Sequence, residues 1–350
     1  MKTVSLCLVC LSVLMFASTR QPVKAQDASR ALPVTSDSKQ NVTSQTGKLV
    51  IQPQFDDAYR FSEGLAAVKI GDKWGFIDKT GKLVIPPQFE SISESYENEA
   101  RSFKTFSEGV AGVQVGEKKW GYIDKTGKFV IPPKFEFVTN FSQGVAAVRI
   151  GNKSGYIDKT GKFIIPPIFE GSGNFSEGVA VAVIGSKSGY INKTGKFVIK
   201  PQFDKAESFQ QGQAKVWIGE KPHCIDKTGK LLKQQSDTCG LTFSEGLLAV
   251  NRTEEPVLCS SFGQCSVGYI DKTGKIAIEP KFSAAKNFSE GLAPVALFGD
   301  HEGHSPVFGS WGYIDKTGKI VIPTDFRDAK SFSEGLAPVM IRGKWGYISR

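Results

Sequence analysis

Histidine is scarce in this sequence, with three copies in 350 residues. His301 and His304, in His-Glu-Gly-His, have a spacing that could bring two imidazoles to one metal ion. The stretch contains glycine and lies in an insertion, unlike the helix of a zinc protease, and no third ligand is evident. No serine or cysteine lies in a recognisable nucleophile elbow. We therefore expect a solvated loop at these histidines, and no metal site, cofactor or catalytic residue.

The sequence also has no apolar run long enough to cross a bilayer at its N-terminus. The run there, Val4–Ala17, is too short to span. Lys2 precedes it and Val23–Ala25 offers small residues for cleavage, which is typical of a secretory signal. We predict that residues 1–25 are removed on export, with an uncleaved amphipathic anchor as the alternative.

The predicted mature chain starts with a polar stretch. Residues 26–45 are rich in Ser, Asp, Gln and Thr without periodicity, and we expect a flexible lead-in. Removing the signal takes three positive charges from the formal +9 of the whole chain, so the protein stays mildly basic. We expect it in the periplasm, the cell envelope or outside the cell, with no transmembrane segment after cleavage.

Cysteine is limited to six copies, and two of them lie in the predicted signal. The four that remain are an even number in an exported chain, which makes them candidates for two disulfides. Three pairings are open. We favour Cys259 with Cys265, five residues apart in one loop, and Cys224 with Cys239, which flank one hairpin. Four unpaired thiols are the alternative.

The chain is dominated by one repeated stretch, Gly-Tyr-Ile-Asp-Lys-Thr-Gly-Lys, as at Gly121–Lys128. Its aspartate can cap a turn and its second glycine can adopt the left-handed conformation of a hairpin loop. Copies of Thr-Gly-Lys start at residues 46, 80, 126, 160, 194, 228, 273 and 317. Eight repeats of about 34 residues, with three insertions, therefore occupy residues 46–350.

A period of 34 residues also occurs in helical repeats, but the pattern within each unit predicts strands. Glycine and proline interrupt it every few residues and leave no window for a helix. Apolar runs such as Leu83–Ile85, Leu65–Ile70 and Trp74–Asp78 are joined by tight turns. We predict an all-β fold of three-stranded antiparallel meanders, with room for a fourth short strand in the longer connection.

The two ends of the repeat region complement each other. The first unit supplies only an outer strand, at Lys48–Ile51, and the last supplies only its two partners, in Leu336–Ile348. We therefore prefer a closed, propeller-like ring, in which the first strand completes the last meander. An open β-solenoid is the alternative.

The Trp-Gly pairs and the Phe-Ser-Glu-Gly stretches resemble the bacterial WG-repeat, or KWG-repeat, family. The pairs stand in KWGFID from Lys73, KKWGYID from Lys118, SWGYID from Ser310 and KWGYIS from Lys344. The resemblance implies a β-rich repeat protein, often exported and without an assigned activity, and it carries no catalytic residues. Four middle repeats depart from the motif and have Ser154, Ser188, Pro222 and Val267 at the tryptophan position.

The tryptophans fall in repeats one, two, seven and eight, at Trp74, Trp120, Trp311 and Trp345. These repeats are contiguous only if the chain closes. One hypothesis is an aromatic arc that stacks sugar rings or peptide side chains. The alternative is that the tryptophans are core positions.

Three charged patterns suggest chemistry. The Lys-Thr-Gly-Lys turns fail as a P-loop, because the spacing is one residue too long and Phe129 stands where Ser or Thr would bind magnesium. The Phe-Ser-Glu-Gly glutamates, such as Glu63, would share similar environments, which does not suit a general acid paired with a nucleophile. The turn lysines, such as Lys125 and Lys128, would gather on one face and could attract an anionic polymer. Solvated turn lysines are the alternative, and nucleic acid is not expected.

The insertions distinguish individual repeats. They lie around Ser91–Arg101, Thr253–Ser266 and Asp300–Ser310. We expect all three to emerge at the end opposite the Lys-Thr-Gly-Lys turns, and insertions on one face of a repeat array are typical of binding surfaces. The sequence therefore predicts an exported, non-enzymatic scaffold that binds a protein, glycan or envelope component. A polysaccharide- or peptide-acting hydrolase and a structural envelope protein are the alternatives.

Overall fold

The computed structural model describes residues 47–92, 106–116, 119–233, 239–240, 243–252, 266–297 and 310–350. They lie in one compact unit, Ser44–Arg350. The described residues form strands and turns only, so they include no helix that could cross a membrane. The all-β prediction is confirmed.

The strands belong to four classes, according to their position in a sheet. The short inner strands are β2 (Asp57–Ala58), β6 (Ser91–Ile92), β10 (Phe137–Val138), β14 (Gly171–Ser172), β18 (Lys205–Ala206), β24 (Ala284–Ala285) and β28 (Asp328–Ala329). The second strands are β3 (Ala66–Ile70), β7 (Ala111–Val115), β11 (Ala146–Ile150), β15 (Ala180–Ile184), β19 (Gln213–Ile218), β21 (Leu247–Arg252), β25 (Ala293–Ala296) and β29 (Leu336–Ile341). The third strands are β4 (Lys73–Ile77), β8 (Lys119–Ile123), β12 (Lys153–Ile157), β16 (Lys187–Ile191), β20 (Lys221–Asp226), β22 (Ser266–Asp271), β26 (Trp311–Ile314) and β30 (Lys344–Ser349). The outer strands are β1 (Leu49–Phe55), β5 (Leu83–Phe89), β9 (Phe129–Phe135), β13 (Phe163–Phe169), β17 (Phe197–Phe203), β23 (Ile276–Phe282) and β27 (Ile320–Phe326).

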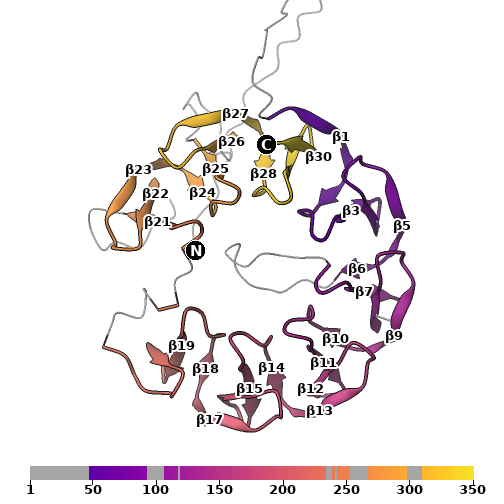
Figure 1. Cartoon of the computed structure of the whole chain (residues 1–350), viewed down its shortest axis with the longest axis vertical. Helices are drawn as coiled ribbons and strands as arrows, with labels where there is room; N and C mark the ends of the chain where they lie inside the picture. The colour runs from indigo at the N-terminus through magenta and orange to yellow at the C-terminus, as the bar shows by residue number, and fades with distance from the viewer. Residues whose placement is uncertain are drawn as a thin grey trace, which may run out of the picture. The chain divides into compact units, whose positions relative to one another are not determined.

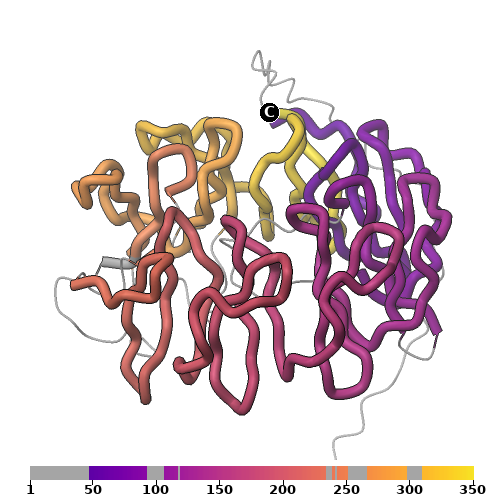
Figure 2. Tube along the Cα trace, turned by 60° about the horizontal axis from the view of Figure 1, so that its bottom comes forward, coloured from indigo at the N-terminus to yellow at the C-terminus, as the bar shows by residue number. Residues whose placement is uncertain are grey.

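These strands form eight antiparallel sheets, which we call blades 1 to 8. Blade 1 has the order β2-β3-β4-β5, and the same order recurs along the chain. Blades 5 (β18-β19-β20) and 6 (β21-β22-β23) have three strands among the described residues. Figure 1 shows the blades following one another in chain order around a common centre, and Figure 2 shows the chain of each blade running back and forth between two faces. The predicted meander is therefore confirmed, and a short inner strand is its fourth member.

The first strand belongs to the last blade. β1 pairs with β30, with Leu49 opposite Ile348 and Phe55 opposite Trp345, and blade 8 has the order β1-β30-β29-β28. This pairing of the two ends is the one that a ring requires. It fills the edge that β30 would otherwise expose.

The glycine of each Trp-Gly pair has a steric reason. A Cβ on Gly75 would lie 2.6 Å from the carbonyl oxygen of Ile85, because β5 passes directly over this point. The same close approach recurs in the other blades that have an outer strand. In blade 5, where no outer strand is described, His223 occupies this position. The one substitution of the glycine thus coincides with an interrupted outer edge.

The core lies between neighbouring blades. Outer strands alternate buried and exposed residues, as in β5, where Ile85 and Phe89 are buried. A tyrosine of the third strand packs edge-on against a phenylalanine of the next blade, as Tyr122 does with Phe141 at 4.9 Å between ring centroids. The Tyr122 hydroxyl also donates to the carbonyl of Thr139 at 2.7 Å. Each fully buried tyrosine therefore joins two blades by both packing and a hydrogen bond.

Candidate binding face

One face of the unit is built from the Asp-Lys-Thr-Gly-Lys hairpins and the Ser-Glu-Gly turns, and we call it the KTGK face. In the hairpin at 124–128, the Asp124 carboxylate accepts from Thr126 N at 2.9 Å, Thr126 Oγ1 at 2.6 Å and Lys128 N at 3.1 Å. The Thr126 hydroxyl is the main reason why the pKa of Asp124 lies below its ordinary value. Gly127 has a φ of 86°. The predicted aspartate cap and left-handed glycine are both present. The hairpin aspartates therefore stabilise their own turns.

The Ser-Glu-Gly turns are two-residue hairpin loops. Ser62 and Leu65 exchange backbone hydrogen bonds, at 2.8 and 3.3 Å, around Glu63 and Gly64. Both central residues have positive φ, 55° and 88°, as a type I′ turn requires. Glutamate is unusual in this conformation. The repeat keeps it there in most blades, which implies that the side chain does something glycine or asparagine could not.

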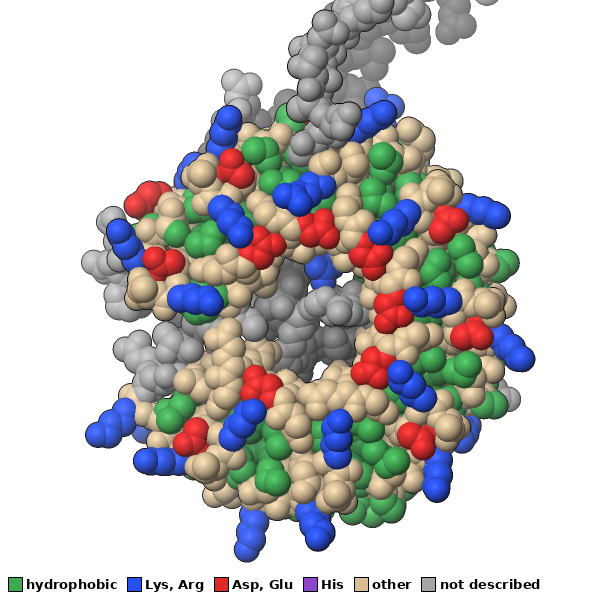
Figure 3. Space-filling model, in the orientation of Figure 1, with side chains coloured by type: hydrophobic (Ala, Val, Ile, Leu, Met, Phe, Trp, Pro, Cys, Tyr) green, Lys and Arg blue, Asp and Glu red, His purple; other side chains and the backbone are tan. Residues whose placement is uncertain are grey.

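Those glutamates tie neighbouring blades together. The Glu63 carboxylate accepts from Gly109 N of blade 2 at 3.0 Å and pairs with Lys125 of the blade 2 hairpin at 3.2 Å. Glu334 does the same from blade 8 to blade 1, with Gly64 N at 3.1 Å and Lys79 at 3.1 Å. Figure 3 shows carboxylates and lysines side by side around the inner rim of the unit. The charge of the first lysine in most Lys-Thr-Gly-Lys hairpins is therefore partly neutralised by an adjacent glutamate.

A second series of bonds runs beside the first. The Ser62 hydroxyl donates to the Phe106 carbonyl of the next blade at 2.7 Å, and Ser333 donates to Phe61 across the junction of blades 8 and 1 at 2.7 Å. The equivalent donors in the other bonded junctions are Ser107, Ser142, Ser176, Ser244 and Ser289. The serine of the Phe-Ser-Glu-Gly motif thus links neighbouring blades by a hydrogen bond.

Three of the rim glutamates have pKa values shifted away from that of a general acid. Burial tends to raise the pKa of Glu334, but hydrogen bonds from Lys79 and Gly64 outweigh it and hold that pKa below its ordinary value. The pKa values of Glu177 and Glu245 are lowered by the same kind of contacts. A general acid needs a raised pKa. These three carboxylates are shifted the other way.

The four tryptophans pack within the protein. Trp74 is 6% exposed and lies 5.2 Å from the ring of Tyr59, and Trp345 is 3% exposed. Lys330 Nζ lies 4.4 Å from the centre of the Trp345 ring. Trp120 and Trp311 are half-buried, and Lys286 Nζ lies 4.6 Å from the centre of the Trp311 ring. Trp74 and Trp345 are therefore core residues in this conformation.

Comparison with known proteins identifies a family for these repeats. A family model described as "WG containing repeat" matches residues 44–74, 74–101, 120–153, 155–187, 189–221, 268–297 and 311–345. The chain belongs to this family of WG-repeat proteins. No curated protein sequence matches it. The WG repeats themselves thus carry the identification.

Solved structures resemble the chain in fold alone. The computationally designed protein Ika8 has 12% identity and a TM-score of 0.51, with 87% of this chain and 100% of that chain covered. BamB from Moraxella catarrhalis has 12% identity and a TM-score of 0.39 over 70% of this chain and 83% of its own. The WD40 β-propeller domain of Doa1 has 10% identity and a TM-score of 0.33 over 87% and 96%.

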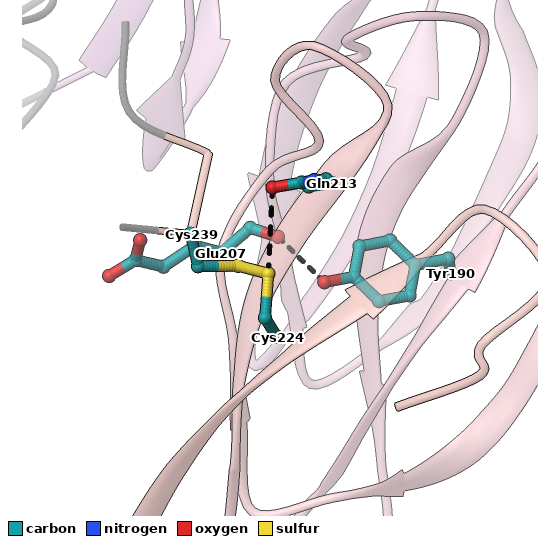
Figure 4. Close-up of a disulfide and its surroundings, with 5 residues drawn as sticks. All are labelled: Tyr190, Glu207, Gln213, Cys224 and Cys239. Carbon is teal, nitrogen blue, oxygen red and sulfur yellow. Dashed lines mark hydrogen bonds between the residues drawn. A yellow bond between two sulfur atoms is a disulfide. The ribbon is translucent and has the colours of Figure 1, made fainter. Parts of the chain in front are cut away.

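Blade 5 of this WG-repeat protein is bonded by a disulfide to the segment that follows it. Cys224 lies at the tyrosine position of β20, and it is bonded to Cys239 on the segment that leads into blade 6. Figure 4 shows the bond beside Gln213, whose Oε1 lies 3.7 Å from Cys224 Sγ, and beside Tyr190, whose hydroxyl donates to the Glu207 carbonyl at 2.7 Å. The favoured Cys224–Cys239 pairing is thus present in the structure. Cys259 and Cys265 lie outside the described residues.

The metal prediction involves residues that are not described. His301 and His304 both lie outside the described ranges. Among the described residues, no group of three or more His, Cys, Asp or Glu side chains is placed to hold a metal ion.

The predicted common face of the insertions concerns residues 93–105, 253–265 and 298–309, which lie outside the described residues. The flanks of the first insertion are Ile92, at the end of β6, and Phe106, before the Ser-Glu-Gly turn of blade 2. β6 runs antiparallel to β7, so this short strand runs toward the KTGK face. The other two insertions join second strands to third strands, β21 to β22 and β25 to β26, and these strand ends lie at the far face, opposite the KTGK face.

Two further features were not predicted from the sequence. The tyrosine hydroxyl bonds and the serine bonds between blades both follow from constant spacings, such as the 17 residues from Tyr156 to Gly173. A search for pairs of motif positions that recur at one spacing would have found them. Their partners are backbone carbonyls, however, and these carry no residue signature.

Proposed function

We propose that this WG-repeat protein is an exported, non-enzymatic scaffold that binds a protein, glycan or other envelope component through the insertions at 253–265 and 298–309. The observation that carries the proposal is the position of their flanks. Both insertions replace a tight turn at the far face, in blades 6 and 7. These blades are adjacent, because Glu245 of blade 6 accepts from Gly291 N of blade 7 at 3.1 Å. Long loops grouped on one face of a rigid repeat array are a common form of binding site.

Export is part of the proposal and has two supports. The first is the signal-like segment at residues 1–25. The second is the disulfide between Cys224 and Cys239, since such bonds persist in oxidising compartments. Reading the processed N-terminus of protein recovered from outside the cytoplasm tests it. A chain that keeps residues 1–25 and remains in the cytoplasm would contradict it.

The binding test uses loop replacement. Residues 253–265 and 298–309 are each replaced by Gly-Asn, the pair that makes the equivalent turn of blade 3 at Gly151–Asn152. We expect both variants to fold and to lose at least about tenfold in saturable binding to the isolated cell envelope of the source, a change of about 1.4 kcal/mol. A matched control replaces Gly219–Glu220 of blade 5 with Gly-Asn and keeps full binding.

The outcomes separate the alternatives. Unchanged binding by both loop variants would overturn the proposal. Turnover of an envelope polysaccharide or peptide by purified protein would favour the hydrolase. Self-association without any saturable envelope binding would favour a structural envelope protein.

A further inference from the structure

The rim of the KTGK face contains a carboxylate-binding arrangement that is repeated around the unit. A backbone N–H from the Gly of one Ser-Glu-Gly turn, and usually the first lysine of the same blade's hairpin, hold a glutamate from the preceding blade. The acceptor–donor pairs are Glu63–Gly109, Glu108–Gly144, Glu177–Gly212, Glu245–Gly291, Glu290–Gly335 and Glu334–Gly64. The glycine N–H thus binds a glutamate six times, and a lysine joins it in five of these cases.

Blade 4 has the same donors but no glutamate facing them. Gln143 occupies the acidic position in blade 3 and keeps the turn, with a φ of 57°. Lys193 of the blade 4 hairpin still reaches it and donates to the Gln143 carbonyl oxygen at 2.8 Å. Gly178 N donates to no other residue in the part of the chain that the structure describes, in contrast to its six equivalents. The junction of blades 3 and 4 thus keeps the turn geometry of the other junctions but lacks their glutamate carboxylate.

The blade 4 hairpin also lacks the negative charge of the capping aspartate. Asn192 replaces the capping aspartate, and its Oδ1 accepts from Thr194 N at 3.0 Å, Thr194 Oγ1 at 2.7 Å and Lys196 N at 3.1 Å. These contacts match those of Asp124, so the substitution preserves the turn and removes only charge. The side chains of Lys193 and Lys196 are exposed. The nearest rim glutamate in the chain of blade 4, Glu177, is paired with Lys227 at 3.0 Å.

We propose that Gly178 N and Lys193 Nζ bind the side-chain carboxylate of an acidic peptide segment from a partner. A peptide is favoured because the six internal ligands of the equivalent donors are themselves glutamate side chains. An N–H and an ammonium group together provide charge-assisted hydrogen bonds to a carboxylate. The local excess of two lysines attracts it. By their positions in the repeat, Gly246 and Lys272 of blade 6 correspond to a second, weaker copy, since Gln211 stands at the glutamate position of blade 5 and Asp271 keeps its charge.

The test follows backbone amide shifts by NMR while a glutamate side-chain analogue, N-acetylglutamate amide, is added to the full chain. We expect a saturable shift at the Gly178 amide with a Kd of roughly millimolar, and a hexaglutamate peptide to bind at least about tenfold more tightly. Both shifts should weaken as salt is raised. The loops at the far face play no part, so the loop-replaced variants should respond as the parent does.

Two charge variants decide the question. Gln143→Glu supplies an internal carboxylate, so the Gly178 response should disappear while the Gly246 response remains. Glu108→Gln should make the Gly144 amide respond to the same compound. If Gln143→Glu leaves the Gly178 shift intact, or if inorganic phosphate or a uronic acid polymer saturates the site more tightly than hexaglutamate, the proposal is wrong.

Discussion

Blades 8 and 1 meet through non-covalent bonds, whereas blade 5 is bonded by a disulfide to the segment that leads into blade 6. At the first junction Tyr347 OH donates to the Tyr59 carbonyl at 2.7 Å, and Lys330 Nζ lies 3.1 Å from Asp57 Oδ1. At the second, Cys224 stands in place of the tyrosine, and Gln210 and Gln211 stand in place of the serine and glutamate. All three motif residues that join other blades are thus substituted where the covalent bond occurs.

The comparison shows that a repeat junction can lose its standard bonds if another constraint takes their place. The junction of blades 8 and 1, which we call the closing junction, must hold the two ends of the repeat region together. It uses the full set of repeat contacts plus the β1–β30 pairing. The disulfide lies between two blades that have three strands each among the described residues, and so have less sheet than the others. A bond that limits the unfolded chain can offset that loss.

The largest expected effect comes from breaking the closing junction. Deleting residues 46–52 removes most of β1, including buried Ile51, and separates Phe55 from its partner Trp345. Deleting a buried side chain of this size costs about 2–5 kcal/mol, so a loss at the upper end or beyond is expected in the free energy of unfolding. Denaturant unfolding measures it.

The control for that deletion removes residues 26–32 from the predicted lead-in. Small-angle scattering adds a second readout, because a compact chain of this length has a radius of gyration of about 20 Å. Unchanged stability, or an elongated monomer in the parent chain, would favour an open solenoid over a ring.

The next largest effect should come from the disulfide junction. Cys224→Ser or Cys239→Ser opens a bond with a sequence separation of 15, which corresponds to about 3 kcal/mol. In a background where Cys259 and Cys265 are both replaced by Ser, reduction with dithiothreitol should lower the stability of the chain that keeps Cys224 and Cys239 to that of the variants, and leave the variants unchanged. If reduction does not alter the unfolding midpoint of that chain, the disulfide does not support this junction.

Much of the fold could be predicted from the sequence because the repeat encodes local rules. The hairpin chemistry of Asp124 and Gly127, the strand alternation and the complementary ends are all properties of neighbouring residues. The short inner strands, such as β6 with two residues, leave almost no sequence pattern and were predicted only as room for a fourth strand. Trp74 illustrates the limit at the site: its residue type suits both a ligand platform and a core position, and only its burial tells them apart.

A smaller effect is expected from one hydroxyl at the closing junction. Tyr347→Phe removes the donor to the Tyr59 carbonyl, which should cost about 1 kcal/mol. Cys224 marks the junction where the chain already lacks this hydroxyl. Asp72→Asn, at an exposed turn position, is the control and should change stability by less than about 0.5 kcal/mol. Equal stabilities of Y347F and the parent would mean that packing alone joins the blades.

The smallest effect is a pH dependence that belongs to the closing junction and has no counterpart at Gln211. Burial opposes ionisation of Glu334, but Lys79 and Gly64 outweigh it, so its pKa in the folded state lies below the ordinary 4.5. A carboxyl whose pKa falls on folding stabilises the protein above its unfolded pKa, and the gain disappears as pH drops through the folded pKa. Glu334→Gln should therefore reduce stability by about 0.2–1 kcal/mol at pH 7 and by less near pH 3. Unfolding at both pH values measures the difference, with Gln211→Leu as the uncharged control at the disulfide junction. A deficit in E334Q that is the same at pH 3 and pH 7 would mean that the side chain acts by shape and hydrogen bonding rather than by charge.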